Sequence, residues 1–397
     1  MNGSSVYSHF NSEAELDSFV ESRLKLYIDH PACYGVSIGD EQSYDQIVNG
    51  FKDIMQSLHR VLTKLGRTDF YLGNNLHPFS ASDETLAGAN YKTSSDAENY
   101  HELNYLTYLN AYLNASGNDY IQFDAYPFAD NKKGGNYGKN SDDSSTANGI
   151  TYFYMANLLL VANFAKENNL ELKMVGQSTT YYGTRIIDRK DMAWIYNMML
   201  GMGVKHISSF VYCNRGTSGV SKEGWLDESS PLNGNGERND HYYLFQSTLM
   251  EIQQFSKFIS AFDYEWCNLF NFTPSWIEST FQGKVKPNTA YVYEYMRSMS
   301  SYSSTKTYGE FSSLTVNQDW VLVSGLKAKA DGKKMFMIQN VYNNFENELL
   351  QNITVTLNAT YNYAVIYESG LPRVVTLNSK TLNLQLSSGR AAFVLVY

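Results

Sequence analysis

Cysteine is scarce in this chain of 397 residues, which contains three cysteines and seven prolines. Cys33, Cys213 and Cys267 stand far apart in the sequence, and no two of them form a C-x-x-C pair. This spacing excludes the disulfide framework that stabilises many small secreted domains, and it offers no cysteine-based metal site. The chain is long enough to bury a sizeable hydrophobic core instead.

Positive charge and long apolar runs are also lacking. The 31 Lys and Arg residues are outnumbered by 40 Asp and Glu residues, which gives a formal net charge of −9. A nucleic-acid partner would require a basic face, which this balance does not favour. The longest apolar stretch, residues 155–164, is interrupted by two asparagines and is shorter than the roughly 18 residues of a membrane span. Residues 1–5 are polar and do not resemble a signal peptide. From the charge balance and the short apolar runs, we expect no nucleic-acid partner and no membrane partner.

Aromatic residues, by contrast, are abundant. They make up 15% of the chain and include 32 tyrosines. Most of these rings are expected to pack in the core. An exposed Tyr or Trp can instead stack its apolar face on the C–H groups of a sugar, while its polar tip forms a hydrogen bond. The composition is therefore compatible with a protein that handles carbohydrate.

Strand-like and helix-like segments alternate over the first two thirds of the chain. A helix is expected after Ser12, because Ser12 and Glu15 have the spacing of a capping box. Five short apolar segments, each followed by polar or ionisable residues, are expected to be strands: residues 34–38, 70–72, 120–123, 172–175 and 206–211. This alternation indicates parallel strands, whose polar ends would form the C-terminal rim of a β/α barrel, where active sites lie. A doubly wound open sheet produces the same alternation and remains an alternative.

The pattern changes after about residue 265. Seven short β-like runs, separated by Asn, Gly, Ser or Pro, are expected to form a small antiparallel β-sandwich: residues 321–323, 334–338, 353–357, 364–367, 374–377, 382–386 and 392–396. We therefore expect a barrel-type domain at residues 1–264 and a C-terminal β-domain at residues 265–397.

The most distinctive local motif is His-Pro-Ala-Cys-Tyr-Gly-Val-Ser-Ile-Gly-Asp-Glu at residues 30–41. It resembles the β-galactosidase-like and related bacterial glycoside hydrolases of clan A. Their (β/α)8 barrels often carry His-Pro-Ala and then Asp-Glu-Pro at the end of the fourth strand. Gln42 stands where that proline would be. Four later segments fit the same family in order: residues 123–128, 175–178, 203–207 and 210–212.

The resemblance, which covers most of the chain, implies a TIM-type β/α barrel followed by a β-domain. It assigns Glu41 to the end of the fourth strand as the general acid/base that protonates a glycosidic oxygen. A carboxylic acid in a partly dry pocket can have a raised pKa and remain protonated near neutral pH. The alternative is that Asp40 and Glu41 only cap the helix that starts near Ser43.

A glycosidase of this kind needs a second carboxylate. The family places it at the end of the seventh strand, where this chain has Gln177, and an amide cannot act as a carboxylate nucleophile. Asp124, at the end of the preceding strand, is the next candidate, with a structural hydrogen bond as the alternative role. A non-catalytic carbohydrate-binding protein on a glycosidase scaffold therefore remains the second functional hypothesis.

Polar and aromatic residues at the other strand ends are suited to sugar hydroxyls. The residues expected to bind substrate are Asp40, Asn75, Tyr126, Gln177, Tyr212 and Trp225, with Asn74, His77 and Tyr181 in the same group of strand-end residues. The histidines are too scattered for a metal site, and no cofactor is expected. The expected partner is an oligo- or polysaccharide.

If Glu41 ends the fourth strand, this chain holds only strands four to eight of the barrel. We then expect either self-association or a further N-terminal segment that completes the barrel, because an open arc exposes sheet edges. An extracellular or cell-surface location is slightly favoured over a cytoplasmic one.

Overall fold

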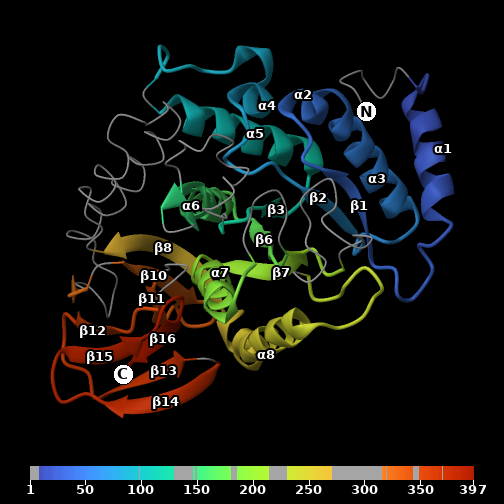
Figure 1. The fold of residues 1–397 in the computed structure, drawn as a ribbon. Helices are drawn as coiled ribbons and strands as arrows, with labels where there is room; N and C mark the ends of the chain where they lie inside the picture. The colour runs from blue at the N-terminus through green and yellow to red at the C-terminus, as the bar shows by residue number, and fades with distance from the viewer. Residues whose placement is uncertain are drawn as a thin grey trace. The chain divides into compact units, whose positions relative to one another are not determined.

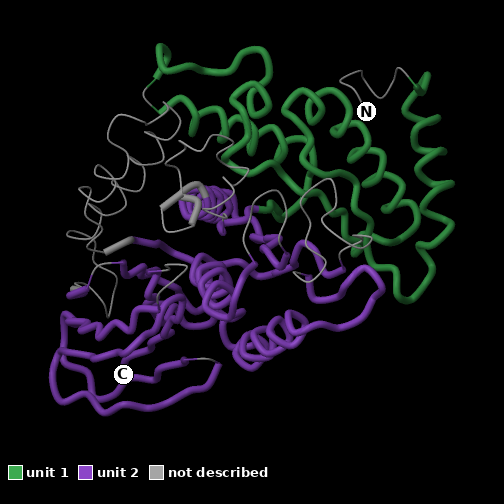
Figure 2. Tube along the Cα trace, in the orientation of Figure 1, with its two compact units in different colours: residues 1–124 green, residues 125–397 purple. Residues whose placement is uncertain are grey.

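The computed structural model describes residues 9–97, 99–128, 146–147, 150–179, 186–213, 230–270, 315–318, 320–342, 348–368 and 370–397. The chain divides into two compact units, residues 1–124 and 125–397, which are coloured separately in Figure 2. The first unit holds the ends of the first three predicted strands. The two units are described in turn.

Unit 1 alternates helices and strands (Figure 1). Its elements are α1 (Glu13–Leu24), β1 (Gly35–Asp40), α2 (Tyr44–Gln46), η2 (Ile47–Phe51), α3 (Lys52–Lys64), β2 (Tyr71–Asn75), α4 (Asp83–Ala87), η3 (Gly88–Asn90), α5 (Tyr100–Ser116) and β3 (Tyr120–Asp124). The expected helix cap is confirmed, because the Ser12 side chain accepts a hydrogen bond from the Glu15 backbone N–H. The helix itself ends at Leu24.

The strands of unit 1 are parallel, as the alternation predicted. β1 pairs in parallel with β2, and the register shifts between Ser37 and Gly39. A parallel bridge then joins Leu76 to Phe123, directly after β2 and within β3. The carboxyl ends of the three strands consequently lie at one edge. The first predicted strand is present as β1, which is only partly buried and pairs with β2 alone among the described strands.

Apolar faces of the helices account for the core of unit 1. α3 buries Met55, Leu58, Val61 and Leu62 at helical spacing. α5 buries a row of aromatic side chains, including Tyr105, Tyr108 and Tyr112. Most of the tyrosines that α5 contributes are therefore core residues, as expected for aromatic residues in general.

Unit 2 contains a second parallel pair and the antiparallel sheets. Its elements are β4 (Thr146–Ala147), β5 (Ile150–Thr151), α6 (Tyr152–Glu167), β6 (Glu171–Gln177), α7 (Arg189–Gly201), β7 (Val204–Phe210), α8 (Asp240–Ile259), β8 (Phe262–Phe270), β9 (Thr315–Val316), β10 (Val321–Ala328), β11 (Lys334–Asn340), β12 (Gln351–Thr356), β13 (Tyr363–Glu368), β14 (Leu371–Thr376), β15 (Thr381–Leu386) and β16 (Ala391–Val396). β6 and β7 are parallel, with Gln177 opposite Phe210. The chain therefore combines parallel β/α segments with separate antiparallel sheets.

The predicted C-terminal β-structure is confirmed. All seven predicted β-like runs are strands, and they belong to a six-stranded sheet, ordered β14-β13-β16-β11-β10-β8, and a three-stranded sheet, β15-β12-β9. Apolar side chains from both sheets form one buried cluster that includes Val323, Ile338, Ile353, Leu384 and Val394. Sequence reasoning missed β8, which pairs antiparallel with β10.

The antiparallel sheet is tied to the helix before it. Trp194 of α7 donates its ring N–H to the Val341 carbonyl, at 3.0 Å, and Gln339 of β11 donates to the Trp194 carbonyl, at 2.9 Å. Asn197 of the same helix donates to the Gly389 carbonyl. These contacts explain why residues 125–397 form one compact unit. The division into domains at residues 264 and 265 remains a prediction, and that position lies inside β8.

Candidate active site

The candidate site lies in unit 1, at the carboxyl edge of its parallel strands. Asp40 ends β1, Asn75 ends β2 and Asp124 ends β3, while Glu41 follows β1 directly. Three residues predicted to be functional from sequence, Glu41, Asn75 and Asp124, are thus brought to the same edge. The Asn75 side chain also donates a hydrogen bond to Asp40, at 3.1 Å.

Glu41 has an unusual backbone conformation. Its φ is 47°, in the left-handed region that non-glycine residues seldom adopt. Its N–H donates to the Asn75 carbonyl at 2.8 Å, which links the ends of β1 and β2. Strained backbone of this kind concentrates at functional sites, because a residue without a special task is readily replaced there by glycine.

The structure assigns the cap of the next helix to other residues. Ser43 is the N-cap of α2, and its side chain accepts from the Gln46 N–H, while the Gln46 side chain accepts from the Ser43 N–H. This is a complete capping box. The N-cap hydrogen bonds of α2 are therefore made by Ser43 and Gln46, and the alternative in which the Asp40 and Glu41 carboxylates only meet the helix dipole stays a prediction.

The carboxyl of Glu41 is held in a setting that favours its protonated form. Burial, followed by the negative charges of Asp124 and Asp40, raises its pKa from the usual 4.5 to about 7. The side chain is still 41% exposed, so it can be reached from solvent. The His77 ring lies close, with Nδ1 3.8 Å from Glu41 Oε2, and burial lowers the pKa of His77.

Two tyrosines of α5 fix the loops that carry Glu41 and His77. The Tyr108 hydroxyl donates to the Gln42 carbonyl at 2.7 Å and accepts from the His77 backbone N–H at 3.2 Å. The Tyr105 hydroxyl donates to the His77 carbonyl at 3.1 Å. Sequence reasoning missed both tyrosines, because a helical row of aromatic residues carries no signal that distinguishes core packing from such contacts.

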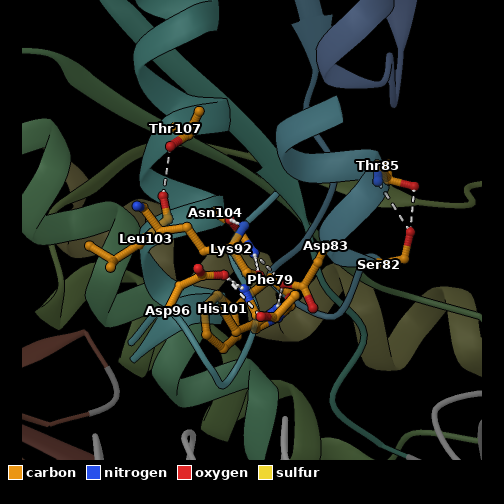
Figure 3. Close-up of polar contacts among 11 residues, drawn as sticks. Phe79, Ser82, Asp83, Thr85, Lys92, Asp96, His101, Leu103, Asn104 and Thr107 are labelled. Atoms are coloured by element: carbon orange, nitrogen blue, oxygen red, sulfur yellow. Dashed lines mark hydrogen bonds and ion pairs between the residues drawn. The ribbon is translucent and has the colours of Figure 1, made fainter. Parts of the chain in front are cut away.

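A buried polar cluster holds the loop after β2 against α5 (Figure 3). His101 places one ring nitrogen 2.7 Å from an Asp83 oxygen and the other 2.6 Å from the Phe79 carbonyl. Both ring nitrogens of His101 are therefore engaged, one with a side chain and one with the backbone. Asn104 donates to Asp83 and to the Lys92 carbonyl, and its oxygen accepts from the Lys92 N–H. Although burial raises the pKa of Asp83, hydrogen bonds from His101 and Asn104 lower it below its usual value.

The amide at the end of β2 contrasts with that cluster. Asn74 is 1% exposed, and neither its side-chain oxygen nor its side-chain nitrogen has a hydrogen-bond partner among the described residues. The same holds for Gln42 Oε1 and Asn75 Oδ1. Buried polar atoms in proteins are almost always hydrogen-bonded, so a concentration of exceptions beside Glu41 requires an explanation.

The remaining predicted site residues fall in unit 2 or outside the described residues. Gln177 is 1% exposed, and its side chain accepts from the Phe128 N–H and donates to the Thr179 carbonyl. Tyr126 is buried against the Phe210 ring, and Phe210 begins a cis peptide bond to Val211. Tyr212 is half exposed and packs against Tyr242. Trp225 and Tyr181 lie outside the described residues.

Neither a metal site nor a membrane-spanning helix is found among the described residues. No group of three or more of their His, Cys, Asp or Glu side chains is arranged to hold a metal ion. No helix within them has the length and apolar character needed to cross a membrane.

The raised pKa of Glu41 predicts a pH-dependent difference in stability between the wild type and Glu41→Gln. The folded state binds the Glu41 proton more tightly than the unfolded state, so the free energy of unfolding of the wild type falls as pH rises from 4.5 to about 7. Glutamine does not titrate, so the stability of the variant does not fall for this reason. Because the side chain is 41% exposed, solvent screening leaves an effect on the order of 1 kcal/mol. Urea unfolding should show the variant gaining relative stability across this pH range, and a constant difference would contradict the raised pKa.

The chain was compared with known proteins. No protein-family model matches it, and no curated protein matches it in sequence. It is similar to the solved structure of a GH27 β-L-arabinopyranosidase from Geobacillus stearothermophilus, with 8% identity and a TM-score of 0.46 over 98% of this chain and 62% of that chain. Two further similar structures are an Anoxybacillus α-amylase and the endo-β-1,4-mannanase from Thermotoga petrophila. The α-amylase has 10% identity and a TM-score of 0.37, over 89% of this chain and 67% of that chain. The mannanase has 9% identity and a TM-score of 0.32, over 94% of this chain and 70% of that chain. This chain thus spans less than two thirds of the arabinopyranosidase, and likenesses of this size define neither its fold nor its function.

Proposed function

We propose that this chain is a glycoside hydrolase-like protein on a partial β/α barrel, and that Glu41 is its general acid/base. The observation that carries the proposal is the placement of two carboxyl groups, Glu41 and Asp124, at the carboxyl edge of parallel strands. They are close enough for the charge of Asp124 to raise the pKa of Glu41. The strained backbone of Glu41 supports the same assignment.

The two carboxyl groups are suited to different tasks. Glu41, with a pKa of about 7, carries a proton for part of the time at neutral pH and can donate it to a glycosidic oxygen. Asp124 would stabilise positive charge on the sugar or activate water. A pair of carboxyl groups with these two tasks is typical of acid–base sites in glycosidases. Asp40 and Asn75 would accept and donate hydrogen bonds to sugar hydroxyls.

A second candidate function is carbohydrate binding without turnover. It is favoured by Gln177, whose amide occupies the position where the family resemblance expects a nucleophilic carboxylate. Both polar ends of this amide are engaged with the backbone, at 3.1 Å from Phe128 N and 3.4 Å from Thr179 O. The amide of Gln177 is thus hydrogen-bonded to the backbone at both ends in the free protein, and catalysis would depend on Glu41 and Asp124.

The roles of the other residues belong to the same proposal. Tyr126, Gln177, Tyr212 and Trp225 are proposed to contact an oligo- or polysaccharide. Self-association is proposed as one way in which the barrel is completed. The location of the protein outside the cell or at its surface remains a prediction, which fractionation of the native cells would check.

Turnover and binding assays with the purified chain separate the two functions. We expect hydrolysis of at least one member of a panel of aryl glycosides that covers both anomers of the common hexoses and pentoses. Sugar binding without hydrolysis, measured by calorimetry, would favour the second candidate. Neither binding nor hydrolysis across the panel would contradict both.

A further inference from the structure

We propose that Asn74 is a ligand-binding carboxamide that takes two adjacent hydroxyl groups of a sugar, and that the Gln42 side chain covers it in the absence of ligand. This inference rests on the proposed glycan-related function. In this proposal Asn74, which lies near Glu41, recognises two adjacent hydroxyl groups of the sugar.

The buried side chain of Asn74 destabilises the folded state. Its side chain is 1% exposed, and neither end of the amide has a hydrogen-bond partner among the described residues. A buried amide of this kind loses its water contacts without replacement, and an apolar side chain of the same shape would be more stable. A residue that weakens the folded state in this way is best explained by a partner that arrives from outside.

The covering residue is identified by the contacts of Gly39. A β-carbon at Gly39 would lie 1.4 Å from Gln42 Nε2 and 2.7 Å from Asn74 Oδ1. The side-chain amides of Gln42 and Asn74 therefore both lie next to Gly39, in space that a β-carbon would fill. The Oε1 atom of Gln42 is buried and has no hydrogen-bond partner among the described residues. Movement of the side chain away from Asn74 would break no hydrogen bond to this oxygen.

The chemistry of the exposed amide then selects the ligand. A carboxamide offers a donor and an acceptor side by side, in one plane. Two hydroxyls on neighbouring sugar carbons present the complementary acceptor and donor. Glu41 follows Gly39 by two positions, so a sugar held by Asn74 would lie near the proposed proton donor.

The melting temperature of the ligand-free Asn74→Leu variant tests whether the Asn74 amide lacks a hydrogen-bond partner. We expect the melting temperature of Asn74→Leu to rise by about 2–4 °C, because an apolar side chain removes the unsatisfied pair. Asn74→Ala, which avoids any added bulk, should melt close to the wild type. A fall of several degrees in both variants would overturn the inference.

Asn104 provides the matched control for this substitution. It is an asparagine of the same unit with the same 1% exposure, but both ends of its amide are hydrogen-bonded (Figure 3). Asn104→Leu should lower the melting temperature, in the direction opposite to Asn74→Leu. Equal shifts of the two variants would show that Asn74 is not a special position.

Calorimetric titration with sugars tests the ligand. The probes are the methyl glycosides of galactose, mannose and arabinose, together with their single-deoxy analogues. We expect Asn74→Leu to weaken sugar binding at least about tenfold. We also expect the variant to bind one deoxy analogue with the same affinity as the parent sugar, because the amide that contacts the missing hydroxyl is gone. If Asn74→Leu binds a sugar as tightly as the wild type does, this inference fails and the proposed function stands. If the wild type binds none of these probes, the assignment of Asn74 fails, while the proposed function is tested separately by turnover of the aryl glycoside panel.

Discussion

Replacement of Glu41 with glutamine is expected to lower kcat/KM for a glycoside substrate by about 10²-fold or more while leaving the fold intact. Glutamine keeps the size of the side chain and its hydrogen-bonding capacity, but it has no proton to transfer. The loss should be largest for substrates with poor leaving groups, because these require protonation of the departing oxygen. Activated aryl glycosides with acidic leaving groups should lose much less.

Glu13→Gln is the control for this change. Glu13 is a carboxylate of the same unit, in the first turn of α1, and its side chain is 66% exposed. Its replacement should leave kcat/KM unchanged for every substrate. A Glu41→Gln protein that turns over poor and good leaving groups as fast as the wild type would exclude Glu41 as the general acid.

The second large effect is expected at Gln177, where we predict that glutamate destabilises the protein by about 3 kcal/mol at neutral pH. The side chain of Gln177 is 1% exposed and donates to the Thr179 carbonyl. An ionised glutamate would lose this donor and bury a charge. Burial would raise its folded-state pKa, so the stability of the variant should fall as pH rises from about 4.3.

Denaturant unfolding of Gln177→Glu at several pH values measures this effect. Gln385→Glu is the matched control, since Gln385 lies on an exposed position of β15 and its replacement should change stability by less than about 0.5 kcal/mol. A Gln177→Glu variant as stable as the wild type at every pH would mean that position 177 accepts a carboxylate. The retaining mechanism implied by the family resemblance would then become available.

Much of the fold could be predicted from local patterns. All five predicted parallel-type strands and all seven C-terminal strands are present, because period-two alternation and turn residues mark short strands well. β8 was missed, although residues 262–266 alternate apolar and polar side chains, because it directly follows a long helix. The division of the chain at residues 124 and 125 depends on contacts such as those of Trp194 with Val341, which no local pattern encodes.

The candidate site could be predicted only in part. The motif ending at Glu41 drew attention to that residue, and the strand-end rule led to Asp124 and Asn75. The helix-capping alternative arose because a carboxylate near a helix start resembles a cap, and the structure gives this task to Ser43 and Gln46. The covering position of Gln42 and the contacts of Tyr108 arise from tertiary packing, so their sequence neighbourhoods could not indicate them.

The most direct test of the central claim is a ¹³C NMR titration of the side-chain carboxyl groups. The resonance of Glu41 is assigned by its absence from the Glu41→Gln spectrum. We expect its midpoint near pH 7, because burial and the charges of Asp124 and Asp40 favour the protonated form. A midpoint near the usual 4.5 would mean that Glu41 is ionised at neutral pH and has no proton to donate, which would contradict its role as the general acid.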